Sequence, residues 1–220
     1  AAFVVLPIAS LTGGKADQLD VWLESIHNQL LFFGVWVIMA ATALWLFLKK
    51  RHANLRGVGI DTPRLQYIAY GFGGVIVYFA VYFVAVMAIS QLIPSLDLQQ
   101  EQDLGFEAPR QAAEYLSAFV TLVVLPPIIE ELIFRGFLFK GMRATFTFLP
   151  AAIFTSVLFA LGHLEFGNGT PLLWIAGIDT FILSMVMCYV RERTGSIWPT
   201  ILMHALKNMV AFTFLYLVVK

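Results

Sequence analysis

Long runs of apolar residues dominate the chain, and polar residues gather in the segments between them. Apolar runs of about 18 or more residues cross a bilayer as helices, because in hydrocarbon a helix satisfies its own backbone hydrogen bonds. The pattern predicts about six spans, of which the fourth is short: Leu30–Leu48, Tyr67–Ile93, Tyr115–Phe139, Leu149–His163, Pro171–Val190 and Ile197–Val219. We therefore expect an all-α fold, a polytopic transmembrane helical bundle.

Composition agrees with this pattern. The chain is 60% hydrophobic and 13% charged, whereas soluble domains carry about 25% charged residues. We expect a multi-pass integral membrane protein that forms a single transmembrane domain over residues 1–220. The apolar stretch Ala1–Ala9 is too short to cross a bilayer, and whether it is a truncated span or a processed segment stays open. No basic stripe indicates nucleic acid, so the expected partners are the lipid bilayer and a membrane-associated protein or peptide.

Basic residues indicate the orientation. Ten of the fourteen Lys and Arg residues lie on one side of the predicted spans: Lys49, Lys50, Arg51, Arg56, Arg64, Arg135, Lys140, Arg143, Arg191 and Arg193. The loops on the other side are acidic. Because cytoplasmic loops are enriched in Lys and Arg, the basic side is predicted to face the cytoplasm.

Several ionisable residues lie inside the predicted spans, where each is costly and is therefore a functional hypothesis. They are Glu130, Glu131, His163, Asp179, His204 and Lys207. Glu131 and Arg135 are four residues apart, in the favourable order for an ion pair on one helix face. That pair would leave Glu130, about 100° round the helix, free for another task. Lys207 is expected either to snorkel toward the membrane surface or to pair with an acid such as Asp179.

Depth in the membrane brings three of these residues together. If the third and fourth spans turn near Phe146–Thr147, Glu130 and His163 lie equally far from the turn and at one height. His204 lies a similar distance inside the sixth span, so all three are expected in the cytoplasmic half. Gly167-Asn168-Gly169 after His163 would be irregular backbone at membrane depth. Such backbone is tolerated around a water-filled cavity.

These side chains suit the hydrolysis of a peptide bond. A carboxylate in a low-dielectric site is a general base near neutral pH, so Glu130 with His163 could activate a water molecule. His204 and Asn208 share one helix face, where they could stabilise the oxyanion. Pro126-Pro127, just upstream, frees backbone carbonyls and kinks the helix, which would admit an extended peptide.

A zinc site is the alternative for the same residues. If the protein depends on a metal ion, Glu130, His163 and His204 would bind zinc and leave a position open for water. We favour a mechanism without a cofactor, because Arg135 weakens Glu131 as a ligand and Asn208 is a poor zinc ligand.

Three motifs in chain order resemble those of the CPBP family. Glu130-Glu131 with Arg135 is similar to EExxxR, Phe159 with His163 to FxxxH, and His204 with Asn208 to HxxxN. The resemblance covers roughly Ala118–Val210, and the motif-bearing helices occupy residues 115–210. The family comprises CAAX prenyl endopeptidases and bacteriocin-processing relatives (the ABI family).

The resemblance implies a glutamic-type intramembrane endopeptidase. Glu130 and His163 would activate water, and His204 and Asn208 would support the oxyanion. Glu131, Arg135 and Phe159 would support these four catalytic residues. The family was long labelled a metalloprotease family, so zinc stays open. Nothing in the sequence indicates a host that prenylates proteins, and we expect a prokaryotic plasma membrane.

Two further classes of function compete with the protease. One is a catalytically silent membrane scaffold or immunity protein that keeps the fold to bind a partner. The other is a small transporter that relays protons through Glu130 and the histidines. The intact motifs favour the protease over the scaffold, and the lack of a detectable inverted repeat weakens the transporter.

Overall fold

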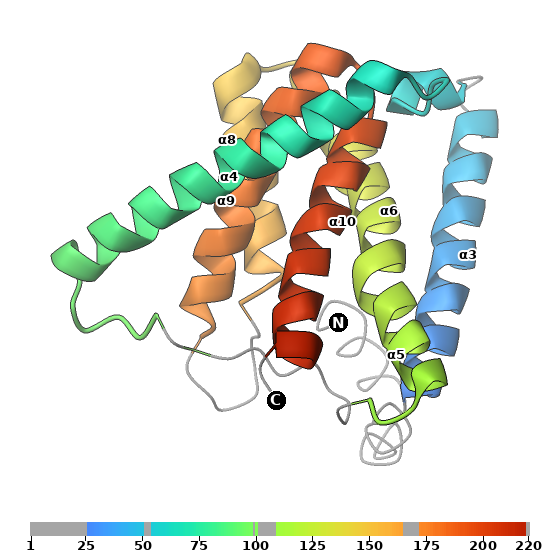
Figure 1. Ribbon diagram of the computed structural model, residues 1–220. Helices are drawn as coiled ribbons and strands as arrows, with labels where there is room; N and C mark the ends of the chain where they lie inside the picture. Colours follow the sequence, from blue (N-terminus) through green and yellow to red (C-terminus); the bar gives the residue numbers. More distant parts are fainter. Residues whose placement is uncertain (1–25, 51–53, 99, 101–108, 165–171, 219–220) are drawn as a thin grey trace, which may run out of the picture.

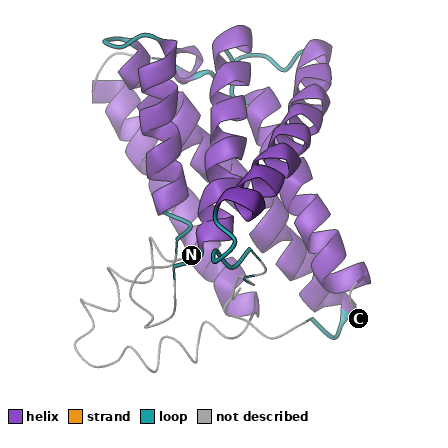
Figure 2. Ribbon diagram, turned by 90° about the vertical axis from the view of Figure 1, so that its left-hand side faces the viewer, coloured by secondary structure: helices purple, strands orange, loops and turns teal. Residues whose placement is uncertain are grey.

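The computed structural model describes residues 26–50, 54–98, 100, 109–164 and 172–218, and within these ranges it contains helices and short connections but no strand (Figures 1 and 2). The all-α prediction is confirmed. Four helical segments are long and apolar enough to cross a membrane: residues 28–50, 65–92, 112–143 and 174–194. Two further helices bring the large helical segments to the predicted six. One of them, α8 (Phe148–Leu161), has 14 residues and is short, as predicted.

The helix boundaries differ from the predicted ones by a few residues. The first two helices are α3 (Ile26–Lys50) and α4 (Leu65–Leu92), joined through the short η1 (Leu55–Val58). The third span consists of α5 (Ala112–Phe119), η2 (Val120–Val124), α6 (Leu125–Glu131), η3 (Leu132–Phe139) and α7 (Lys140–Arg143). After α8 come α9 (Trp174–Thr194), α10 (Trp198–Thr213) and η4 (Phe214–Val218).

The third span changes helix type around its prolines. Pro126 and Pro127 have no backbone N–H, and upstream of them the chain widens into the π-helix η2. A second π-helical stretch, η3, follows Glu131 directly. Single π-turns inside α-helices are frequent at functional sites. The two acidic residues of the first motif therefore lie in a short α-helical segment between two π-helical stretches.

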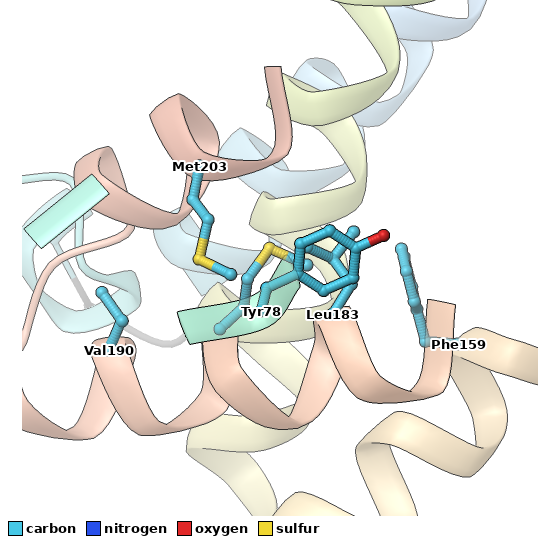
Figure 3. Packing of buried hydrophobic residues seen from close by; sticks show 6 residues of the cluster. Tyr78, Phe159, Leu183, Val190 and Met203 are labelled. Carbon is cyan, nitrogen blue, oxygen red and sulfur yellow. The ribbon is translucent and has the colours of Figure 1, made fainter. Parts of the chain in front are cut away.

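Close packing holds α4 obliquely across α9 and α10 (Figure 1). Two glycines of α4 permit this approach: a Cβ atom on Gly71 would lie 2.7 Å from Leu202 Cδ2, and one on Gly74 would lie 2.7 Å from Met203 Sδ. Small residues at helix crossings have this role in membrane proteins. The buried cluster beneath draws on four helices, with Phe159 at one end in Figure 3: Tyr78, Phe159, Leu183, Met187, Val190 and Met203. On the other side of the bundle, α3 packs against α5 and α6.

Candidate active site

Glu131 lies at the centre of a buried ion pair. Its Oε1 atom is 2.7 Å from Nη1 of Arg135, and both side chains are fully buried. The predicted pair is therefore present. The same oxygen lies 3.1 Å from Nδ1 of His204, so the first and third motifs meet at one carboxylate. Because a carboxylate only accepts hydrogen bonds, Nδ1 of His204 is the donor.

Glu130, the adjacent acid, is in a different environment. Its side chain is 29% exposed, and its Oε2 atom lies 3.9 Å from Nε2 of His204. Within the described residues this oxygen has no hydrogen-bond partner. The rotation of about 100° between adjacent helix residues thus separates a fully buried, ion-paired carboxylate from a partly exposed one.

The end of α8 orients His163. The backbone N–H of His163 donates to Ala160, which leaves the carbonyl of Phe159 without the donor that a continued α-helix would supply. Nδ1 of His163 lies 2.8 Å from that carbonyl oxygen. A carbonyl oxygen only accepts, so Nδ1 carries the proton and Nε2 of the neutral ring keeps a lone pair. The helix terminus therefore selects the tautomer that can accept a hydrogen bond from water.

Phe159 contacts all three motifs. Its ring centroid lies 4.8 Å from that of His163 and 5.9 Å from that of His204. The guanidinium carbon of Arg135 lies 4.6 Å from the same centroid. Two nitrogens of Arg135, Nε and Nη2, have no hydrogen-bond partner in the described part of the chain. The face of the Phe159 ring supplies a cation–π contact to that guanidinium.

Asn208 makes a contact that was not predicted from the sequence. Its Nδ2 atom donates to the carbonyl oxygen of Leu122, at 2.9 Å. The donor to that carbonyl would be residue 126 in an α-helix and residue 127 in a π-helix, and both are prolines. The Pro126-Pro127 step was the signal for this contact, because it leaves one specific carbonyl unsatisfied. Asn208 fills that position from another helix.

A pocket of about 290 Å³ opens beside Glu130 and His163. Its other lining residues are apolar: Phe33, Trp36, Val37, Leu125, Pro126, Ile129, Ile133, Phe134, Phe159 and Gly162. The wall from α3 was not predicted, because that span is apolar on all sides and nothing in its pattern singles out one face. Residues 165–171, which include Glu165 and the predicted Gly-Asn-Gly break, lie outside the described residues.

Two polar networks flank the site. Lys207 Nζ lies 2.7 Å from Asp179 Oδ2, as predicted, and Tyr78 donates to the other oxygen of Asp179. The second network, the Asp61 cluster, joins the loop before α4 to the start of α10. Asp61 accepts hydrogen bonds from Ser196 Oγ at 2.5 Å, from Tyr67 Oη at 2.6 Å and, at its backbone oxygen, from Trp198 Nε1 at 2.7 Å. This cluster was not predicted from the sequence.

A zinc site requires three or more ligand side chains that face one point. Across the described ranges, no group of three or more His, Cys, Asp or Glu side chains has the arrangement of a metal site. His204 uses Nδ1 for Glu131, which leaves Nε2 as its nitrogen toward Glu130. Glu130, His163 and His204, the residues named for zinc from the sequence, therefore do not form such a group.

One family model matches the motif-bearing part of the chain. Residues 112–210 match the family described as type II CAAX prenyl endopeptidase Rce1-like. That region of the chain is therefore similar to the Rce1-like family, and this match supports the resemblance to the CPBP family. The matched region contains the four candidate catalytic residues and their three supporting residues.

Two curated relatives are similar over different lengths. An uncharacterized 24.3 kDa protein of Escherichia coli is 27% identical over 99 residues, 44% of this chain and 43% of the relative. The uncharacterized protein YyaK of Bacillus subtilis (strain 168) is 28% identical over 198 residues, 87% of this chain and 60% of the relative. The chain thus spans less than two thirds of the length of either relative. No solved structure matches the chain significantly.

Proposed function

We propose that this protein is an intramembrane endopeptidase that hydrolyses a peptide bond of a membrane-associated protein. One observation carries the proposal: of two adjacent glutamates, Glu131 is neutralised by Arg135 and His204, whereas Glu130 faces a pocket that it shares with His163. A general base needs an available carboxylate beside its substrate, and Glu130 is the acid in this position. The match of residues 112–210 to the Rce1-like family supports protease activity in general.

The proposed reaction uses one water molecule and no cofactor. The water donates one hydrogen bond to the carboxylate of Glu130 and one to the lone pair of His163 Nε2. Glu130 takes the first proton as the water oxygen attacks the substrate carbonyl carbon. The C–N bond of the resulting tetrahedral intermediate then breaks, and Glu130 returns the proton to the leaving amine.

His204 and Asn208 are proposed to stabilise the oxyanion. His204 binds Glu131 through Nδ1, and its other ring nitrogen, Nε2, is the one proposed to contact the substrate oxygen. Asn208 uses one amide proton for Leu122 and has a second for the same oxygen. The Glu131–Arg135 pair and Phe159 hold these groups in place. The substrate is bound from the bilayer of a prokaryotic plasma membrane, with the site in its cytoplasmic half.

Cleavage of membrane-anchored peptides by the purified protein in lipid vesicles tests the proposal. Mass spectrometry identifies the products. Glu130→Gln keeps the shape of the side chain but removes the base, and should lower the rate by about 10²–10⁴-fold. Glu192→Gln, at a partly exposed ion pair with Arg143, is the matched control and should cleave like the parent. If Glu130→Gln cleaves as fast as the control, the proposal is wrong.

The same assay separates the alternatives. Loss of cleavage with phenanthroline, and its recovery with added zinc, would favour the metal-dependent version. If the protein folds in vesicles but cleaves none of the membrane-anchored peptides, the result would favour the scaffold or immunity protein.

A further inference from the structure

A second and larger groove lies between α3 and the loop that leads into α4. Its volume is about 1020 Å³, and it does not include Glu130 or either histidine of the motifs. Three buried leucines at its base come from two parts of the chain: Leu44 and Leu48 from α3, and Leu132 from the third span. Trp45 lines the groove beside them. The groove therefore has an apolar base in the region of the bilayer.

Two cations line the groove at one end of α3. Lys49 and Arg56 are exposed, and within the described residues neither forms an ion pair with an acid. Lys49 Nζ lies 5.1 Å from the ring centroid of Trp45, which directs the ammonium group over the groove wall. The one acid that lines the groove, Asp61, already accepts hydrogen bonds from Ser196 and Tyr67. The polar end of the groove is thus complementary to an anion.

The distance between the cations and the apolar lining matches an amphiphile. Ala41, which also lines the groove, lies eight residues before Lys49 on α3. At about 1.5 Å per residue, the groove extends about 12 Å from the ammonium group into the apolar part of the helix. Both cations belong to the basic side that is predicted to face the cytoplasm, where anionic lipids are bound by basic pockets at helix ends.

We propose that this groove binds one anionic phospholipid. Lys49 and Arg56 contact the phosphate of the headgroup, and the acyl chains lie over Ala41, Leu44 and Leu132. A zwitterionic headgroup is disfavoured, because its ammonium group would meet two cations. Leu132 follows Glu131 in sequence, so the bound lipid contacts the helix that carries the candidate catalytic acids. The site is separate from the proposed peptidase pocket and does not depend on that activity.

Native mass spectrometry of the full chain in detergent tests this inference with phosphatidylglycerol and phosphatidylcholine of identical acyl chains. Phosphatidylglycerol is expected to bind more tightly, and Lys49→Gln with Arg56→Gln should weaken its binding by about tenfold or more, since each basic residue near an anionic headgroup contributes roughly fivefold. Lys50→Gln with Arg193→Gln removes the same charge from the same side outside the groove. That control should leave the preference intact.

The apolar half is tested without changing charge. Ala41→Trp fills the groove and should abolish binding of phosphatidylglycerol, whereas Ala43→Trp, on the same helix but outside the groove, should not. The inference is overturned if the two lipids bind equally, or if both charge-removing pairs weaken binding alike. It is also overturned if Ala41→Trp binds like Ala43→Trp, or if glycerol phosphate displaces the lipid at equal concentration, because the acyl chains would then contribute nothing.

Discussion

The motif-bearing helices and the first two helices of the chain differ in what surrounds them. In the most apolar windows of the third span and of α9, 44% and 50% of the residues are buried. In those of α3 and α4 the shares are 6% and 11%. The motif-bearing helices are thus held mainly by contacts within the protein, whereas the first two helices present most of their surface to the bilayer.

The two regions contribute to the candidate active site in different ways. The candidate catalytic groups and their buried partners all come from residues 112–210, where charge is neutralised inside the protein. The first two helices contribute through a pocket wall and through the Asp61 cluster. α3 also lines the separate groove that is proposed to bind a phospholipid. Substitutions in the motif-bearing helices should therefore affect stability and activity together, and those in the pocket wall of α3 should affect selectivity with little effect on stability.

The largest expected effect is in the buried ion pair. Arg135→Leu leaves the carboxylate of Glu131 buried and unpaired with the guanidinium, and should lower the free energy of unfolding by about 3–5 kcal/mol. Glu131→Leu with Arg135→Leu should recover much of this loss but no activity, because His204 then lacks its partner. Denaturant unfolding in mixed micelles measures the stability.

Arg143→Leu is the control for that prediction. Its ion pair with Glu192 is partly exposed, so the loss should be about 1 kcal/mol or less. Equal losses for Arg135→Leu and Arg143→Leu would contradict the role of the buried pair in stabilising the motif-bearing helices.

A smaller effect is expected where Asn208 meets the proline step. Asn208→Ala removes the hydrogen bond to Leu122 and should lower the free energy of unfolding by about 1–3 kcal/mol. Pro126→Ala supplies a backbone N–H at the α-helical position, so Asn208→Ala with Pro126→Ala should be more stable than Asn208→Ala alone. A double-mutant cycle measures the coupling.

The activity of the same double variant separates two roles of Asn208. If its kcat stays low although its stability is restored, Asn208 also acts on the oxyanion. If kcat recovers with stability, Asn208 is a positioning residue. A double variant that is as unstable as Asn208→Ala would contradict the contact with Leu122.

The sequence predicted most of this architecture, for identifiable physical reasons. The membrane spans are long apolar runs, and the Glu131–Arg135 pair follows from helical spacing alone. The contact between His204 and Glu131 could not be predicted from the sequence, because this contact joins two helices whose relative rotation depends on packing. Asn208 was interpreted by its chemistry, although the prolines near Leu122 already indicated an unsatisfied carbonyl. Phe33 and Trp36 were missed because α3 has no polar face to distinguish one side.

The pocket wall from α3 provides a test of selectivity. Trp36→Ala enlarges the pocket beside Glu130 and should shift cleavage about tenfold toward peptides with bulkier apolar side chains near the cleaved bond. Its thermal stability should remain close to that of the parent. Ile38→Ala, on an exposed position of the same helix, should change neither property. Cleavage of a peptide series by mass spectrometry measures the shift, and an unchanged preference in Trp36→Ala would remove α3 from the substrate site.

The smallest expected effect lies at the joint between the two regions, the Asp61 cluster. Partial burial alone would raise the pKa of Asp61, but hydrogen bonds from Ser196 and Tyr67, with the nearby charge of Arg64, hold this pKa below its ordinary value. A lowered pKa in the folded state means that the ionised carboxylate stabilises the fold above the unfolded pKa, and that this stabilisation is lost as pH falls through the folded pKa. Asp61→Asn cannot accept both hydrogen bonds and should cost roughly 1 kcal/mol at neutral pH.

The difference in melting temperature between the parent and Asp61→Asn should therefore be constant near neutral pH. It should shrink below about pH 4, where Asp61 of the parent takes up a proton. Ser196→Ala removes one of the two hydrogen bonds to the carboxylate of Asp61. The pH below which this variant loses the stabilisation by ionised Asp61 should therefore be higher than in the parent. Thermal unfolding between about pH 3 and pH 7 measures both shifts. If the difference in melting temperature stays the same over this range, the charge of Asp61 does not stabilise the contact between α10 and the loop before α4. Apolar packing and the hydrogen bond from Tyr78 to Asp179 would then couple α4 to the motif-bearing helices.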